Sequence, residues 1–114
     1  MHREGMNEDN ATAEDFLCDF CHNHWADNRP MVEGHRGSLI CGPCLTVAYR
    51  EVVLGNGGEA LAEREVCTLC LAPTSDPVWV SPAFAQAKAC RKCLKQSAGV
   101  LQKDVDSGWM KPAE

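Results

Sequence analysis

Apolar residues along this chain form two similar series, and each series has the pattern of a short hairpin followed by a helix. In the first series, Met31-Val32 and Ser38-Leu39-Ile40 lie on either side of a glycine-containing turn, which predicts two short antiparallel strands. The next apolar residues recur at the i, i+3, i+4, i+7 and i+8 spacing of one helix face. They are Leu45, Ala48, Tyr49, Val52 and Val53, and Gly55 is placed to end that helix.

The second series repeats this order less cleanly. Val78-Trp79-Val80 predicts one strand, and the chain returns from Ala83 to Ala89 toward a final helix. That helix is expected to turn four residues inward: Leu94, Ala98, Leu101 and Val105. Three of them stand 49 residues after apolar residues of the first helix, so both helices are expected to bury the same face. Gly99 should weaken the middle of the second helix by about 1 kcal/mol.

The same 49-residue offset relates the eight cysteines, which all belong to Cys-x-x-Cys pairs. The four pairs are Cys18/Cys21, Cys41/Cys44, Cys67/Cys70 and Cys90/Cys93. Each half therefore reads C-x2-C-x19-C-x2-C, which is within the spacing class of a structural zinc site, and the fixed offset indicates a duplicated unit. Two residues between thiolates make a tight turn that aims both sulfurs at one point, and two such turns complete a tetrahedron. We expect one Zn²⁺ in each half of the chain.

The order of these elements predicts a small, metal-stabilised α+β fold of two tandem treble-clef zinc fingers. In each finger a zinc turn, a short hairpin and a helix surround the ion, and the free N–H groups at the start of the helix favour thiolates. Sharing of an ion by successive pairs makes each unit self-sufficient, whereas a cross-braced arrangement interleaves the pairs. The constant offset favours the first arrangement, and Gly55-Asn56-Gly57-Gly58 is expected to be a flexible break between independent units.

These patterns also divide the chain into segments. The first 15 residues are polar and acidic without periodicity, which is typical of a disordered arm. The tail contains Trp109, which could dock it onto the fold. The predicted segments are an acidic arm over 1–15, the first finger over 16–55, a linker over 56–65, the second finger over 66–105 and a tail over 106–114.

Other interpretations of the cysteines compete with zinc. A disulfide framework explains neither the pairing nor the offset, and the expected compartment is reducing. Cys41-Gly-Pro-Cys44 matches the thioredoxin-type redox motif, but no βαβ pattern surrounds it and its counterpart is Cys90-Arg-Lys-Cys93. Four thiolates also suit an iron or iron–sulfur site, which the sequence does not exclude. His22 and His24 are expected to be solvent-facing loop residues beside an already complete four-ligand site.

The distribution of charged residues limits the classes of function that the chain can have. The chain of 114 residues carries 16 acidic and 11 basic side chains, a formal charge of −5, which argues against a general nucleic-acid binder. A basic cluster crowds the last ligand turn: Lys88, Arg91, Lys92 and Lys95. These residues either form a surface that binds an anion or a nucleic acid, or they offset the negative charge of a zinc tetrathiolate.

No apolar run approaches the roughly 20 residues of a membrane span, so we expect a cytoplasmic protein. No nucleophile–base pair stands out, so we expect no enzyme activity.

The first unit combines a Cys-Asp-Phe-Cys turn at 18–21, a glycine in the hairpin, an Ile-Cys-Gly-Pro-Cys segment at 40–44 and an amphipathic helix. In these features it resembles the N-terminal zinc-binding domain of the ClpX unfoldase subunit. The resemblance covers residues 17–54 well, and residues 66–103 mainly through the cysteines. It implies a treble clef whose ligands are Cys18, Cys21, Cys41 and Cys44. It also implies a module that self-associates and recruits substrates and adaptors.

Two features depart from that family. No G-x-x-x-x-G-K-[ST] phosphate loop of an ATPase occurs, and the module is present twice, so that a tandem copy could mimic a self-associated pair within one chain. We therefore expect a zinc-binding protein-interaction module that acts as an adaptor or partner of a protease or chaperone system. The alternative is a nucleic-acid-binding zinc-finger protein that uses the basic turn at 88–95.

Overall fold

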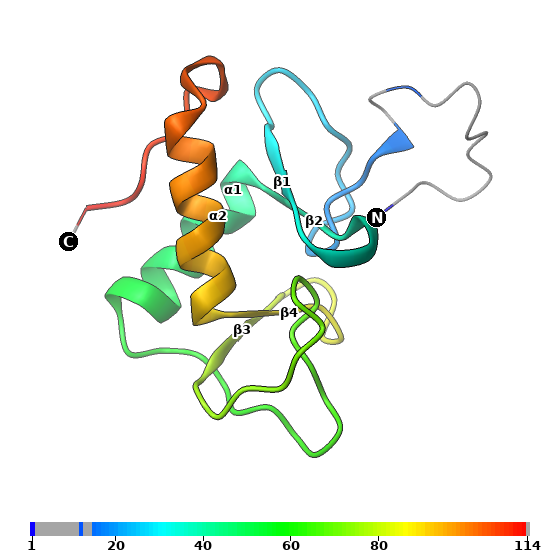
Figure 1. The fold of residues 1–114 in the computed structure, drawn as a ribbon, viewed down its shortest axis with the longest axis vertical. Helices are drawn as coiled ribbons and strands as arrows, with labels where there is room; N and C mark the ends of the chain where they lie inside the picture. Colours follow the sequence, from blue (N-terminus) through cyan, green and yellow to red (C-terminus); the bar gives the residue numbers. More distant parts are fainter. Residues whose placement is uncertain (2–11, 13–14, 114) are drawn as a thin grey trace.

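The computed structural model describes residues 1, 12 and 15–113, in which two short hairpins each lead directly into a helix (Figure 1). The strands are β1 (Met31–Glu33), β2 (Leu39–Cys41), β3 (Val78–Val80) and β4 (Lys88–Cys90). The helices are α1 (Gly42–Ala48), which continues as a π-helix over Tyr49–Leu54, and α2 (Arg91–Lys103). The predicted small α+β fold is confirmed at this level. The acidic arm predicted over 1–15 falls mostly outside the described residues.

The two hairpins differ in register although the spacing between their ligand pairs is the same. β1 pairs with β2 from Met31↔Cys41 to Glu33↔Leu39, whereas β3 pairs with β4 from Val78↔Cys90 to Val80↔Lys88. The loop over 81–87 is therefore two residues longer than the loop over 34–38, and the segment before β3 is correspondingly shorter. The longer second loop reaches the first unit, where the Ser81 hydroxyl donates to the Phe20 carbonyl.

The first helix buries the face that the sequence predicted. Leu45 and Ala48 are fully buried, and Tyr49 and Val52 are nearly so. The helix ends at Gly55 as expected, but this glycine is extended (φ −88°, ψ 179°), and its N–H donates to the Arg50 carbonyl at 2.9 Å. The expected flexible break is thus hydrogen-bonded: the Gly57 N–H donates to the Glu51 carbonyl at 2.8 Å, and Glu59 forms a two-bond bridge with Val78 in β3.

The second helix is shorter than its apolar pattern suggested. Leu94, Ala98 and Leu101 are buried as predicted, but the prediction that Val105 points inward is wrong, because its side chain is 89 % exposed. Asp104 leaves the helical conformation (ψ 98°), and its carboxylate accepts from the Asp106 N–H, which starts a separate 3₁₀ turn over Val105–Ser107. Within the described residues, no helix combines the length and apolar character needed to cross a membrane.

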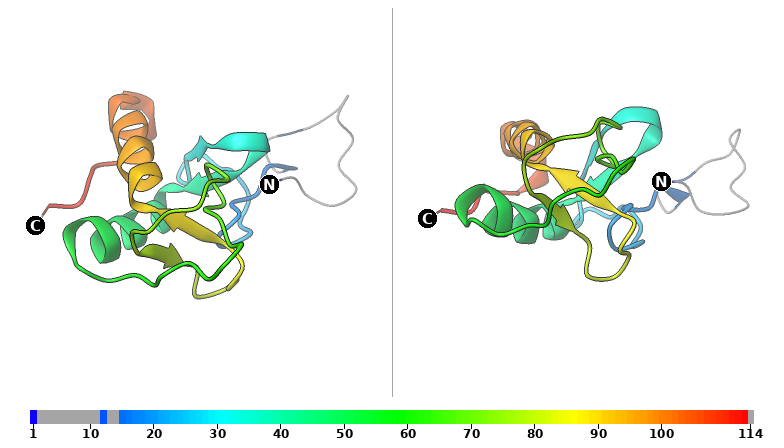
Figure 2. Two further views of the ribbon diagram at one scale, coloured as in Figure 1. Left: turned by 60° about the horizontal axis from the view of Figure 1, so that its bottom comes forward. Right: turned by 90° about the horizontal axis from the view of Figure 1, so that it is seen from below.

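Both units contribute to one hydrophobic core. The helices lie at one side of the molecule and the hairpins at the other, and α2 packs against α1, the π-helical segment and β1 (Figure 2). The largest fully buried side chains come from both halves of the chain: Phe20, Ile40, Leu45, Leu94 and Val78. Folding of each unit therefore includes burial against the other.

The C-terminal tail is docked by its tryptophan. The Trp109 indole N–H donates to the Gly42 carbonyl at 3.1 Å and lies 3.0 Å from the Thr46 hydroxyl oxygen. Both partners belong to the first two turns of α1, so the tail ties the end of the second unit to the first.

Replacing Trp109 with alanine should lower the free energy of unfolding by about 1–3 kcal/mol, because a half-buried aromatic contact and an indole hydrogen bond are lost together. Thermal unfolding of the protein measures this change. Met110→Ala is the matched control, since the Met110 side chain is 80 % exposed and should contribute little. Equal melting temperatures for the two variants would contradict the docked tail.

Candidate metal centres

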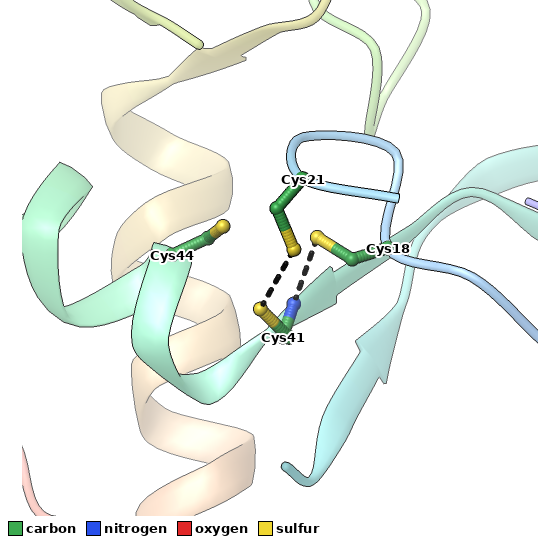
Figure 3. A group of neighbouring side chains, drawn as sticks. All are labelled: Cys18, Cys21, Cys41 and Cys44. Atoms are coloured by element: carbon green, nitrogen blue, oxygen red, sulfur yellow. Dashed lines mark hydrogen bonds between the residues drawn. The ribbon is translucent and has the colours of Figure 1, made fainter. Parts of the chain in front are cut away.

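The four cysteines of the first unit converge from three elements (Figure 3). Cys18 and Cys21 flank the turn before β1, Cys41 ends β2, and Cys44 lies in the first turn of α1. Their Sγ atoms all lie within 4.8 Å of one another. The second unit gathers its cysteines in the same way and within the same limit: Cys67, Cys70, Cys90 and Cys93. The structure thus brings together successive pairs and not cross-braced ones.

The sulfur separations fit a tetrahedral metal ion. With Zn–S bonds of about 2.3 Å, neighbouring sulfurs of a tetrahedron are about 3.8 Å apart. The Sγ atoms of Cys21 and Cys41 are 3.7 Å apart, and those of Cys70 and Cys90 are 3.9 Å apart. All eight cysteines are free thiols, and these separations are far longer than the roughly 2 Å of a disulfide bond. Each group could therefore hold one metal ion.

Backbone N–H groups point at the buried sulfur of each first pair. Cys18 Sγ accepts from the N–H groups of Phe20 and Cys41, each at 3.4 Å, and Cys67 Sγ accepts from the Cys90 N–H at 3.3 Å. Hydrogen bonds of this kind stabilise a thiolate over a thiol. The donors come from the first turn and from the last residue of β2 and β4, and not from the first helical turn, where the sequence placed them.

The neighbouring thiols also control ionisation within each group. Hydrogen bonds from Cys41 and Cys44 lower the pKa of Cys18 to about 2, and a hydrogen bond from Cys93 lowers the pKa of Cys67 to about 4. The pKa of Cys44 and that of Cys93 are raised, because each proton is held by the adjacent thiolate. Repulsion opposes further ionisation in such a cluster, so a divalent cation is needed to hold all four sulfurs as thiolates.

The histidines beside the first group are not part of it. Among the described residues, the candidate metal-binding groups contain cysteines alone. His24 is exposed, with Nδ1 2.9 Å from the Trp25 carbonyl oxygen. The expectation that His22 faces solvent is wrong, because its ring stacks on Phe84 of the second unit with centroids 3.6 Å apart and planes 14° apart.

The predicted basic cluster is divided in the structure. Lys88 is engaged inside the fold: its Nζ lies 2.9 Å from Glu65 Oε2 and donates to the Ala85 carbonyl, and its side chain is only 13 % exposed. The hydrogen bond from Lys88 in turn lowers the pKa of Glu65. Arg91, Lys92 and Lys95 remain exposed near the start of α2. An anion at this surface would therefore meet three cations of the predicted four.

Each Cys-x-x-Cys turn that opens a unit is held by the hairpin loop of the other unit. The Phe20 carbonyl in the first turn accepts a hydrogen bond from the Ser81 hydroxyl, and the Leu69 carbonyl in the second accepts one from the His35 N–H at 2.7 Å. Phe20 and Leu69 are equivalent by the 49-residue offset. The Phe20 ring also packs on Trp79, with centroids 5.4 Å apart. The offset between the two turns was visible in the sequence, but nothing there indicated that each is held by the opposite loop.

Comparisons of this chain with protein-family models, with curated proteins and with solved structures give no match. The two four-cysteine groups are therefore the main indication of function. They identify the chain as a candidate metal-binding module with room for one ion in each unit.

Gly34→Ala tests the contact between the first hairpin and the second turn. A methyl group at Gly34 would lie 2.5 Å from the Leu69 carbonyl oxygen and 2.6 Å from Ser38 Oγ, both closer than carbon and oxygen tolerate. We expect a loss of about 1–3 kcal/mol in the free energy of unfolding, measured by denaturant titration. Gly99→Ala is the control, because nothing lies within 4 Å of a methyl group there. A Gly34→Ala protein as stable as the wild type would show that the two units do not make this contact.

Proposed function

We propose that this chain is a zinc-binding protein-interaction module made of two treble-clef fingers, with one Zn²⁺ in each four-cysteine group. The observation that supports it best is the sulfur geometry, because separations of 3.7 and 3.9 Å match the edges of a zinc tetrathiolate. Four thiolates fill the tetrahedral shell and leave no position for water or substrate, so the ion would have a structural role.

The order of elements around each group supports the treble-clef proposal. In both units a turn supplies two ligands, a hairpin carries the third at its end, and the first helical turn supplies the fourth. This is the order implied by the resemblance of the first unit to the ClpX N-terminal domain. By extension, we propose an adaptor or partner of a cytoplasmic protease or chaperone system as its role.

An apolar hollow beside the first group supports binding of another protein. It has a volume of about 250 Å³ and lies between α1 and the start of the second hairpin loop. Its apolar lining includes Phe20, Pro43, Val47, Trp79 and Pro82. Val47 points outward from α1 although it is apolar, and a concave apolar surface of this kind is typical of a protein interface.

Metal content tests the first part of the proposal. Elemental analysis of protein purified without chelator should find two zinc ions per chain, in a colourless sample whose thiols resist alkylation. Visible absorption together with an equivalent amount of iron would indicate that the four-cysteine groups bind iron and not zinc. Fewer than one ion of any metal per chain would contradict the module itself.

Binding to a purified ClpX-type unfoldase tests the second part. We expect the zinc-loaded protein to bind it, and we expect Val47→Asp to weaken that binding about tenfold by placing a charge in the apolar hollow. Val105→Asp is the matched control, because Val105 is an equally apolar residue that is exposed away from the hollow. Absence of binding by the zinc-loaded protein would remove the unfoldase as partner.

The alternative function, nucleic-acid binding through the basic turn, has less support. Arg91, Lys92 and Lys95 are exposed together, but Lys88 is paired with Glu65, and Asp76 shares the same surface hollow. Phosphate recognition needs an uncompensated positive surface, which this arrangement provides only in part.

A further inference from the structure

A second apolar hollow lies on the outer face of the hairpin formed by β1 and β2. It has a volume of about 360 Å³ and shares no lining residue with the hollow beside the first cysteine group. Val32 and Ile40 point into the core, so strand alternation turns their neighbours in the hairpin to the opposite face. The described lining of the hollow consists of Phe16, Trp25, Met31, Glu33 and Leu39. The first unit therefore has an apolar surface on the side of the hairpin that the core does not use.

The second unit has the same backbone arrangement at the corresponding place. The Asp19 N–H donates to the Leu39 carbonyl at 2.9 Å, and the Thr68 N–H donates to the Lys88 carbonyl at 2.7 Å. In return, the Leu39 N–H donates to the Asp19 carboxylate, and the Lys88 N–H donates to the Thr68 hydroxyl. These pairs are related by the 49-residue offset, so the opening turn and the second strand correspond in the two units.

An ion pair in the second unit takes the place of two apolar residues of the hollow. Glu65 and Lys88 stand 49 residues after Phe16 and Leu39. Lys88 Nζ lies 2.9 Å from Glu65 Oε2, and the lysine side chain is only 13 % exposed. The same local backbone thus forms with charged side chains at these positions. Folding therefore does not require the apolar lining of the first unit, and an exposed apolar surface without a structural role is typical of a binding site.

The charges around this hollow favour a basic ligand. Glu33 is exposed, it is the one charged residue in the described lining, and it forms no ion pair with the described residues. Residues 1–55 carry nine acidic and four basic side chains, whereas the acidic and basic side chains of residues 56–114 are equal in number. A zinc tetrathiolate in the first unit would add further negative charge. A ligand with Lys or Arg beside its apolar residues therefore complements this surface.

The hollow offers a face of side chains for contact. Met31, Glu33 and Leu39 project from the strands, and Trp25, which is 38 % exposed, borders them. Tryptophan and methionine are both enriched in protein interfaces. An amphipathic helix matches such a face, because its residues at i, i+3 and i+4 project from one side and can enter an apolar hollow together.

We propose that the outer face of the β1–β2 hairpin binds a basic amphipathic helix of a partner protein. The apolar residues of the helix contact Trp25 and Leu39, and its lysine or arginine side chains face Glu33. The proposal rests on the proposed function as a protein-interaction module and names the chemistry of a partner. It assigns this surface to the first unit alone, because Glu65 and Lys88 occupy the corresponding place in the second.

The test uses the full zinc-loaded chain and a fluorescein-labelled peptide, followed by fluorescence anisotropy at physiological salt. The peptide has eighteen residues of leucine, lysine and alanine, with the leucines on one helix face. We expect saturable binding of one peptide per chain. A peptide of the same composition whose leucines are spread around the helix should bind about tenfold more weakly, because it cannot place several apolar side chains in the hollow. Glutamate in place of lysine should remove most of the binding.

Phe16→Glu/Leu39→Lys tests the position of the surface. This double variant copies the ion pair of the second unit into the first and leaves the net charge unchanged. It should keep the zinc content and the circular dichroism spectrum, and it should weaken peptide binding about tenfold or more. Val100→Glu/Val105→Lys is the matched control, because both valines are exposed and neither lines the hollow. The control should bind within about twofold of the wild type.

Two single variants keep the test decisive if the double variant does not fold. Trp25→Thr copies Thr74, its counterpart by the 49-residue offset, and should weaken binding about fivefold. Glu33→Gln should weaken binding of the lysine peptide about threefold, because it removes one surface charge pair. Glu63→Gln removes an exposed carboxylate outside the hollow and should change nothing.

Several results would overturn the proposal. They are absence of saturable binding, equal binding of the peptide with dispersed leucines, wild-type binding by the Phe16/Leu39 or the Trp25 variant, and equal weakening in the Val100/Val105 control. A dimer of the wild type in sedimentation that the Phe16/Leu39 variant loses would assign the surface to a second copy of the chain instead. Zinc content and unfoldase binding are measured on the same preparations. Failure of the peptide with two zinc ions present and the unfoldase bound would count against this surface and leave the proposed function standing.

Discussion

Removal of metal should unfold the whole chain and not one unit at a time. Structural zinc supplies about 10–16 kcal/mol of apparent binding free energy per site, which is comparable to the entire stability of a small domain. The core that remains is small, and it is built from cysteines as well as aliphatic side chains. Excess chelator should therefore abolish the helical circular dichroism signal in one transition, and added zinc should restore it.

The relevant control is the same titration with calcium in place of zinc, since a hard cation that prefers oxygen ligands should restore nothing. Tryptophan fluorescence follows the transition in the second unit through Trp79, which is buried in the shared core. A chelated protein that keeps its circular dichroism spectrum and a buried Trp79 would show that the core folds without metal.

Zinc should load the two sites cooperatively, with a minor population of chains that hold one ion. The reason is the reciprocal contact between units: the first turn is held by the Ser81 hydroxyl, and the second by the His35 N–H. An ion that orders one unit also positions the loop that holds the ligands of the other, so the second ion binds more tightly. Native mass spectrometry at half-saturating zinc should find mainly metal-free and two-zinc chains.

Ser81→Ala should reduce this cooperativity. Without the hydroxyl, the buried carbonyl of Phe20 loses its partner, which costs about 1–3 kcal/mol, and the one-zinc form should become a major species. Ser75→Ala is the matched control, because Ser75 is an exposed serine of the same unit. Independent loading in the wild type, with a statistical share of one-zinc chains, would show that the interface transmits no coupling.

Much of the local structure could be predicted because it depends on short-range spacing. Cys-x-x-Cys turns, a strand that ends at Cys41 and a helix that buries Leu45 and Ala48 are each set by a few adjacent residues. The prediction that Val105 points inward was wrong for a physical reason that hydrophobic periodicity does not reflect. Its spacing continues the helix face, but the carboxylate of Asp104 binds the Asp106 N–H and ends the helix first.

The packing of the units on each other could not be predicted, because it depends on contacts between residues some 60 positions apart. Ser81 has no hydrophobic pattern, and its role appears only when the second hairpin loop is seen to be two residues longer than the first. His22 was similarly assigned to solvent, since its partner Phe84 lies in that same loop. The difference in loop length cannot be seen in the sequence, because 19 residues separate the ligand pairs in both units.

The unequal hairpins contact the opposite turns in different ways. At the first position after its leading strand, one half has Gly34, which admits the opposite carbonyl by having no side chain, and the other has Ser81, which donates to it. The two hairpins are therefore complementary at this contact, because one leaves room for the facing carbonyl and the other supplies a hydroxyl donor to it.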